Sequence, residues 1–192
     1  MACSQRGHNR GFLSTPLKSG EIDVAFFRTR PVDPEGLVIT ELLKEPMIVA
    51  MPSNNPLARR GQANRALPMK ALATENFIIY GRRFGHALYS DTITACHAAG
   101  FTPRIVQEAA RIASTLNLVA AGIGIALVPA SLRRVRLDGV AYREIADTKR
   151  PTAELGLASR RGDPAVVVKE FTGLVRRTLK EDQSEGDRSP RT

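Results

Sequence analysis

The loop Gly81–His86 carries the strongest chemical signal in the sequence. It follows the apolar segment Phe77–Tyr80 and precedes a stretch with helical periodicity, which predicts a strand, a loop and a helix in that order. Such a loop turns backbone N–H groups and the positive end of the helix dipole toward the crevice at the carboxyl end of a sheet. The sequence therefore predicts an anion site here, and the alternative is a solvated connection whose arginines serve solubility. The candidate ligand-binding residues are Gly81, Arg82, Arg83, Phe84, Gly85 and His86.

Phe27 and Arg28 are a second pair of candidate ligand-binding residues, at the end of the apolar segment Ile22–Phe27. An arginine can hold a carboxylate through two parallel hydrogen bonds. The alternative is that Phe27 belongs to the core and that Arg28 lies on the surface. Both interpretations remain open at the level of the sequence.

Residues for catalysis or for a metal site do not form a recognisable pattern. Cys96 and His97 are neighbours, and neighbours on a helix point to different faces, so they make a poor metal pair. Cys96 is better interpreted as a small core residue on an apolar helix face. No Gly-x-Ser-x-Gly motif is present, and no serine has an obvious histidine and aspartate partner. We expect a binding protein that is not an enzyme and that uses no metal and no cofactor.

The glycine pair Gly122-x-Gly124 lies inside the segment Leu118–Pro129. This segment predicts the end of a helix, a turn, and a buried strand closed by Pro129. Both glycines can adopt positive φ angles, which would allow the sharp turn. A phosphate-binding loop needs its glycines after a strand and before a helix, which is the opposite order. The pair therefore indicates a turn and not a nucleotide site.

The composition is that of a globular protein, with 192 residues, 43% hydrophobic and 24% charged. This length suits one good core or two small lobes. No apolar run approaches the roughly 20 residues of a membrane helix, and the amino terminus lacks the apolar core of a signal peptide, so we expect a cytoplasmic protein. The net charge of +9 comes from scattered arginine pairs without a nucleic-acid motif, which does not favour sequence-specific DNA binding by this chain.

Alternating apolar patterns predict an α/β fold with largely parallel sheets. The predicted strands are Ile22–Phe27, Leu37–Leu43, Met47–Met51, Phe77–Tyr80, Arg104–Glu108, Ile123–Val128, Val140–Ile145 and Leu155–Ser159. The predicted helices have their apolar faces at Leu88, Thr92, Ala95, Cys96 and Ala99, at Ile112, Thr115, Leu116 and Val119, and at Val167, Phe171, Leu174, Val175 and Thr178. We expect residues 1–19 to be irregular and residues 181–192 to be a disordered tail.

Several phrases of the sequence occur in an order and at intervals that resemble one known family. They are "LKSGEIDVAF", "LLKEPMIVAMPSNNPLA", "AGFTPRIVQEA", "LVAAGIGIALVPAS", "VAYREI" and "ELGLASRR". From about Leu17 to about Leu179 the chain resembles the effector-binding domain of LysR-type transcriptional regulators. The resemblance implies the fold of type 2 periplasmic binding proteins, with two α/β lobes and a cleft between them. It places lobe one, incomplete, at 20–45 and 153–180, and lobe two at 46–152.

The resemblance also implies a function, a ligand-sensing regulatory domain that binds a small organic acid, with aromatic acids among the candidates. Neither a DNA-binding headpiece nor the first strand and helix of lobe one is visible in the sequence. We therefore expect DNA contact only through a headpiece absent from this chain, no membrane partner, and at most a weak homodimer. The alternative function is a solute-binding protein of the same fold, against which the lack of an export signal counts.

Overall fold

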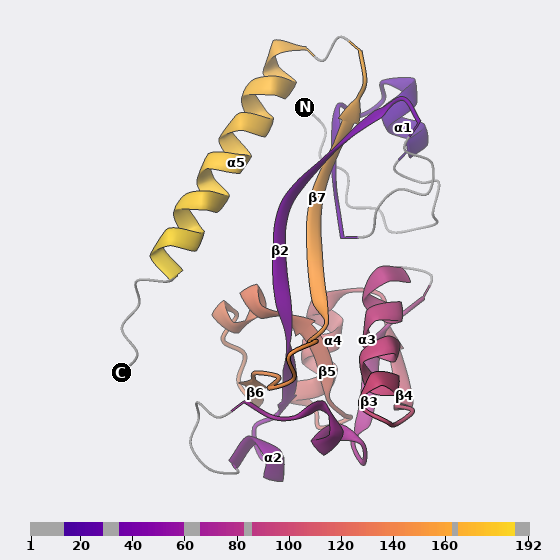
Figure 1. The fold of residues 1–192 in the computed structure, drawn as a ribbon, viewed down its shortest axis with the longest axis vertical. Coiled ribbons are helices and arrows are strands. Elements are labelled where there is room, and N and C mark those ends of the chain that lie inside the picture. The colour runs from indigo at the N-terminus through magenta and orange to yellow at the C-terminus, as the bar shows by residue number, and fades with distance from the viewer. Residues whose placement is uncertain (1–13, 29–34, 60–65, 83–85, 163–164, 187–192) are drawn as a thin grey trace. The chain divides into compact units, whose positions relative to one another are not determined.

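A computed structural model describes residues 14–28, 35–59, 66–82, 86–162 and 165–186 and shows an α/β chain. The chain divides into two compact units (Figure 1). Unit 1 comprises Met1–Lys44 and Glu154–Thr192, and unit 2 comprises Glu45–Ala153. The strands β2 (Leu37–Pro52) and β7 (Thr152–Arg160) carry the chain from one unit to the other. The two points at which the chain passes between the units lie one residue from the borders between the lobes that the sequence predicts.

Unit 1 contains a small sheet and two helices. Its elements are α1 (Ser14–Ser19), β1 (Val24–Phe27), the first part of β2, most of β7, and α5 (Val166–Gly186). β1 pairs antiparallel with β7, and Phe27 lies opposite Gly156. The Arg160 guanidinium donates hydrogen bonds to the carbonyl groups of Leu17 (3.0 Å) and Ile22 (2.8 Å), and it contacts the Asp23 carboxylate at 2.7 Å. One side chain on β7 thereby fixes the turn between α1 and β1.

The sheet of unit 2 is built around the second half of β2. This strand pairs antiparallel with β5 (Ala126–Pro129) and with β6 (Val140–Arg143), so that Val49 faces Leu127 in one ladder and Arg143 in the other. A strand with neighbours on both sides is screened from water, and Val49, Ala50 and Met51 have no exposed surface. Their continuous apolar run is the pattern that such a position requires.

A second sheet in unit 2 consists of β3 (Asn76–Tyr80) and β4 (Arg104–Ala109), which run parallel and are joined by α3 (His86–Ala98). The next helix is α4 (Ile112–Ala120), which buries Thr115, Leu116 and Val119 as its apolar periodicity predicts. The predicted inner face of α3 is confirmed at Leu88, Thr92 and Cys96, which are buried. The remaining elements of the described chain are short: α2 (Pro56–Arg59), η1 (Met69–Leu72) and η2 (Ala130–Arg134).

The predicted glycine turn is present, but only one of its two glycines, Gly122, has the positive φ angle that the sequence suggested for both. Gly122 has φ 78°, which is the left-handed conformation that glycine favours. Gly124 does not have a positive φ. A Cβ atom placed on Gly124 would lie 2.5 Å from the Asn76 carbonyl oxygen, so glycine is needed there for close backbone contact with β3. That contact contains two hydrogen bonds of 2.8 Å, from the Ile125 N–H to Asn76 and from the Ile78 N–H to Ile125.

Other predictions about the elements are wrong. The sheets are not largely parallel, because β1–β7, β2–β5 and β2–β6 are antiparallel pairs, whereas β3–β4 is a parallel pair. β2 is one strand that continues through Pro46, and not two strands. The φ angle of proline suits an extended chain, and proline lacks only the backbone N–H donor. Helix α1 forms within residues 1–19, where irregular chain was expected, and α5 extends to Gly186 into the expected tail.

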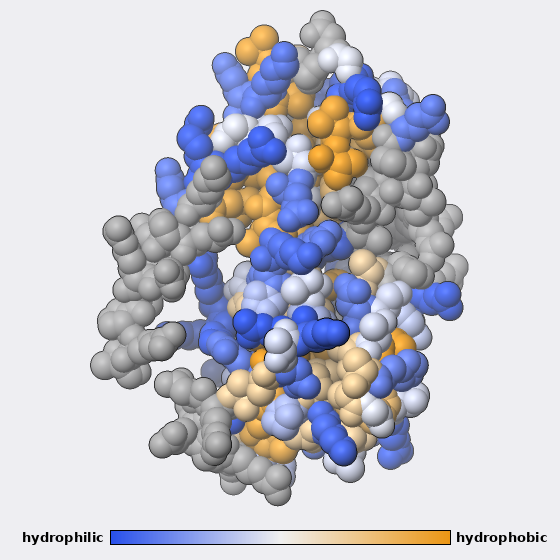
Figure 2. Space-filling view, viewed as in Figure 1, coloured by the Kyte–Doolittle hydropathy of each residue, from blue (hydrophilic) through white to orange (hydrophobic). Residues whose placement is uncertain are grey.

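The molecular surface in Figure 2 is mixed. Hydrophilic side chains are spread across the face shown and are not gathered over one element. On α5, Val166, Val167 and Leu174 are exposed, while Phe171 contacts Phe26 edge-on with 6.2 Å between ring centroids. Among the residues that the structure describes, none of the helices has the length and hydropathy needed to cross a bilayer.

Candidate functional site

The predicted anion loop begins at the carboxyl end of β3. The Gly81 N–H donates a hydrogen bond to the Ala109 carbonyl at 3.0 Å, which fixes the start of the loop beside the end of β4. Gly81 is buried and Arg82 is exposed, and the chain continues into α3 at His86. Arg83, Phe84 and Gly85 lie outside the described residues, as does the side chain of His86. The predicted order of strand, loop and helix is therefore present, and the first two loop residues, Gly81 and Arg82, follow the end of β3.

A second helix begins at the same edge of this sheet. β3 and β4 are parallel neighbours, so their carboxyl ends coincide, and α4 begins three residues after β4 ends. Its N-cap residue is Arg111, which is extended (φ −137°, ψ 146°), exposed, and makes no side-chain cap hydrogen bond. Neither α3 nor α4 carries an acidic residue in its first turn.

The electrostatics of this edge favour a negative charge. The first N–H groups of a helix have no partner within the helix, and the helix dipole adds positive potential there. Two helices start at this edge of the sheet, accompanied by the exposed side chains of Arg82 and Arg111. The arrangement can hold a carboxylate by backbone N–H groups and by arginine.

Arg111 was not among the sequence-based candidates. Its only signal in the sequence is that a strand, a short loop and a helix occur in that order a second time, after Arg104–Glu108. The significance of that repetition depends on β3 and β4 being parallel neighbours, which the local sequence does not reveal.

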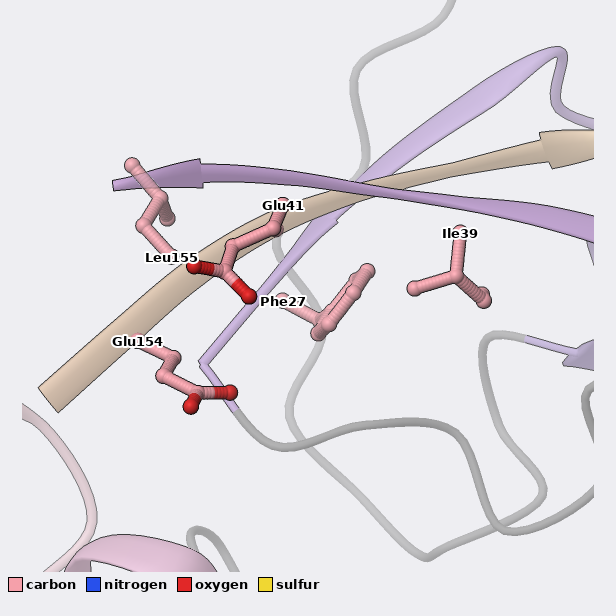
Figure 3. A pocket seen from close by; sticks show the side chains of 6 residues that line it. Phe27, Ile39, Glu41, Glu154 and Leu155 are labelled. Atoms are coloured by element: carbon pink, nitrogen blue, oxygen red, sulfur yellow. The ribbon is translucent and has the colours of Figure 1, made fainter. Parts of the chain in front are cut away.

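Phe27 and Arg28 lie in unit 1, at the end of β1. Phe27 is only 8% exposed and packs in a core cluster with Leu17, Ile22, Ala25, Leu37 and Ala158. Its ring also lines a small pocket of about 10 Å³ that opens to solvent, together with Ile39, Glu41, Glu154, Leu155 and Gly156 (Figure 3). Arg28 is half-buried. Phe27 therefore occupies the core position, and its role in ligand binding stays a prediction.

The charges of the Phe27 pocket differ from those at the edge of β3 and β4. Figure 3 shows the carboxylates of Glu41 and Glu154 facing the space beside the Phe27 ring. Glu154 contacts Lys44, with 3.5 Å between Oε1 and Nζ. An anion entering this pocket would meet two carboxylates of the same sign, and a buried or half-buried like charge is unfavourable. At about 10 Å³ the pocket has room for little more than one water molecule, so it does not support the carboxylate site that Arg28 suggested.

Cys96 has the environment of a structural thiol. It has no exposed surface and lies in the core of unit 2, and burial raises its pKa to about 12. Its neighbour His97 is exposed, so the two side chains do not converge. Within the described parts of the chain, no group of three or more metal-ligating side chains comes together.

Comparison with known proteins decides the family. The model of the LysR substrate binding domain family matches residues 8–180. The chain belongs to this family. Among curated relatives of the LysR domain, the HTH-type transcriptional regulator AlsR of Bacillus subtilis (strain 168) is 31% identical over 155 residues, which cover 81% of this chain and 49% of AlsR. The regulator CatR of Pseudomonas putida is 31% identical over 160 residues, covering 83% of this chain and 53% of CatR.

A solved structure supports the same conclusion about the fold of this LysR domain. The BenM effector binding domain with its effector benzoate superposes with a TM-score of 0.75 and 24% identity, covering 94% of this chain and 78% of that chain. The expected fold of type 2 periplasmic binding proteins is thereby confirmed. The chain spans about half the length of the curated relatives it matches.

Proposed function

We propose that this chain is the ligand-sensing part of a LysR-type transcriptional regulator and that its effector is a small organic acid, with aromatic acids as the first candidates. The observation that carries the proposal is the family match over residues 8–180. The relatives are named as transcriptional regulators, and the BenM domain is described with benzoate as its effector. The proposed role is binding without catalysis.

The proposed mechanism is a shift between arrangements of the two units. An effector that binds one arrangement more tightly than another raises the population of the first. Only β2 and β7 carry the chain between the units, so few backbone torsions need to change for one unit to move. The regulator's output would follow from that population.

The proposed anion site is the edge where α3 and α4 begin. Its residues are Gly81, Arg82, Arg83, Phe84, Gly85 and His86, to which the structure leads us to add Arg111. An exposed helix terminus contributes roughly 0.3–1 kcal/mol toward an anion, and a charged hydrogen bond from arginine adds about 1.5–3 kcal/mol. Two helix termini and one such bond reach about 5 kcal/mol at best, which corresponds to sub-millimolar affinity because 1 mM is about 4.1 kcal/mol.

We further propose that promoter recognition belongs to a separate headpiece and that the regulator works in the cytoplasm. The HTH-type names of the relatives support the first statement. The described part of this chain has scattered arginines, which give salt-sensitive attraction to phosphates without sequence information. Self-association is proposed to be weak, as a loose homodimer.

Calorimetry tests the anion site. The wild-type chain, a double variant Arg82→Ala with Arg83→Ala, and Arg111→Ala are titrated with benzoate and with short dicarboxylic acids. Arg104→Ala is the matched control, since Arg104 is an exposed arginine at the amino end of β4. We expect the first two variants to weaken binding by about tenfold or more and the control to leave it unchanged. Equal affinity in all four proteins would place the anion site elsewhere.

A further inference from the structure

The long helix α5 has an outer face that the rest of the described chain leaves largely exposed. Residues three, four and seven positions apart lie on the same face of an α-helix. One face of α5 packs on unit 1, where Phe171 contacts Phe26. Away from that contact, Val166, Val167 and Leu174 are 70%, 63% and 54% exposed. Figure 1 shows that one long side of α5 is turned away from the strands of unit 1. The outer face consists of Val166, Val167, Glu170, Gly173, Leu174 and Arg177. Three large apolar side chains exposed on one helix face indicate a surface for a partner.

Gly173 lies in the middle of the outer face, and no contact within the described chain requires glycine there. Its φ is not positive. A Cβ atom added to it would have the Arg177 side chain as its nearest neighbour beyond the adjacent backbone, at 3.9 Å, which is ordinary van der Waals contact. Glycine weakens the interior of a helix compared with alanine, because it loses more backbone freedom on folding. A second helix crossing at this position would explain the glycine, since small residues let two helix axes approach to about 8 Å.

The charges of the outer face are arranged so that two copies of it complement each other. Glu170 and Arg177 lie equally far, along the helix, from the midpoint between Gly173 and Leu174. They are about 10 Å apart along the helix axis, which is too far for them to pair with each other. Both are exposed, and neither forms an ion pair with another described residue. A twofold axis through the midpoint would place Glu170 of each copy opposite Arg177 of the other. The same axis would place Leu174 of each copy over Gly173 of the other.

We propose that the outer face of α5 is a self-association surface, on which α5 of a second copy of this chain packs in the antiparallel direction. A twofold contact uses the same patch on both copies, so the patch must be complementary to itself, as this combination of one acidic, one basic, one small and one large residue is. A helix of 21 residues is about 31 Å long. One pair of such helices buries less than the roughly 800 Å² per partner of a stable complex, so the dimer is weak. The inference rests on the proposed function only for the loose homodimer, whose surface it names, and it is independent of the proposed effector.

Sedimentation equilibrium of the full chain, over a series of protein concentrations at physiological salt, measures the dissociation constant of the dimer. The variants are Glu170→Arg, Arg177→Glu, the combination of both, and Leu174→Lys. Arg176→Glu is the matched control, because Arg176 is an exposed arginine of α5 that lies outside the outer face. It changes the net charge by the same amount as Arg177→Glu and so separates local pairing from general repulsion. Circular dichroism checks that each variant is folded, and the wild type is also titrated with benzoate.

We expect the wild type to dimerise, and Leu174→Lys and each single charge reversal to raise the dissociation constant about tenfold or more, because each reversal turns two attractive contacts into two repulsive ones. The combined reversal restores opposite charges across the twofold axis, so it should restore dimerisation. The control should dissociate as the wild type does.

Three results would overturn the proposal: a wild type that stays monomeric at every concentration, single reversals that leave the dissociation constant unchanged, or a combined reversal that does not restore the dimer. Helices that pair in the parallel direction would give the second result, because Glu170 would then face Glu170 of the other copy. The proposed effector is judged separately. A monomeric wild type that binds benzoate would refute the dimer and leave the sensing role intact, and a dimer with the expected charge dependence that does not bind benzoate would support the surface and refute the effector class.

Discussion

The glycine turn before β5 offers a sharp comparison between two ways in which glycine can be required. Gly122 has φ 78° and nothing within 4 Å of a Cβ placed on it. Gly124 has an ordinary φ, but a Cβ placed on it would meet the Asn76 carbonyl oxygen at 2.5 Å. We predict that alanine is tolerated far better at Gly122 than at Gly124.

The magnitudes follow from the contacts. At Gly122 the left-handed conformation costs alanine about 1–2 kcal/mol, offset by roughly 0.4–1 kcal/mol from the stiffer unfolded chain, which leaves a loss of about 1 kcal/mol. At Gly124 the methyl group must push β3 away and break the two 2.8 Å hydrogen bonds between Asn76, Ile78 and Ile125. Ile78 and Ile125 are buried, so their backbone groups would lose partners without gaining water, at about 1–3 kcal/mol each. The expected loss is about 2–6 kcal/mol, before the same offset of roughly 0.4–1 kcal/mol from the stiffer unfolded chain.

Urea unfolding followed by circular dichroism measures both losses, with Gly122→Ala serving as the matched control for Gly124→Ala. Gly124→Ala should also weaken the binding of benzoate in a titration, because β3 leads into the proposed anion loop at Gly81. Free energies of unfolding that agree within about 0.5 kcal/mol, the usual range of neutral substitutions, would refute the argument from close contact.

Three further predictions concern single side chains and DNA. Burial raises the pKa of Cys96 to about 12, so in a Cys3→Ser background the folded chain should resist alkylation by iodoacetamide at pH 8.5 until it is unfolded. The pKa of the same thiol is about 9.0 in the unfolded chain, so its contribution to stability should be present below pH 9 and be lost between pH 9 and 12. Cys96→Ala should lack this pH dependence. The buried Glu45 carboxylate accepts hydrogen bonds from the Ser131 N–H (2.6 Å) and hydroxyl (3.1 Å). Glu45→Gln should therefore lower the free energy of unfolding in urea by about 1.5–3 kcal/mol. Ser131→Ala keeps the hydrogen bond from the N–H and should lower it by less. In a gel shift at physiological salt this chain should show no nanomolar preference for one operator over competitor DNA. Such a preference would contradict the proposal that a separate headpiece recognises the promoter.

The sequence predicts the local structure well where a residue's environment follows from its neighbours. The apolar runs at Met47–Met51 and Phe77–Tyr80 are buried strands, and the periodicity of α4 marks its inner face. Strand partners are not local: Val49 pairs with Leu127 and Arg143, which are far away along the chain. The antiparallel pairing was therefore missed, as was the continuity of β2 through Pro46, where a proline usually indicates an interruption.

The candidate site shows the same difference between features that follow from the local sequence and features that depend on distant segments. The order of strand, loop and helix placed Gly81 and Arg82 correctly at the carboxyl end of β3, because that order is local. Arg111 was missed because its relevance depends on β4 lying parallel to β3. The need for glycine at position 156, where a Cβ atom would collide with the Phe27 ring, was also invisible, since that ring lies on another strand.

Local charge, and not the net charge of +9, decides where an organic anion can bind. Two unit charges 4 Å apart interact by about 1 kcal/mol in water and by about 4 kcal/mol near a protein surface, and the interaction weakens over a screening length of roughly 8–10 Å in physiological salt. Arginines far along the surface therefore contribute little to a bound carboxylate. Glu41 and Glu154 repel a carboxylate in the Phe27 pocket even though the chain as a whole is basic. Arg82, Arg111 and two helix termini act at short range, which is why we propose the edge of β3 and β4, and not the surroundings of Phe27, as the anion site.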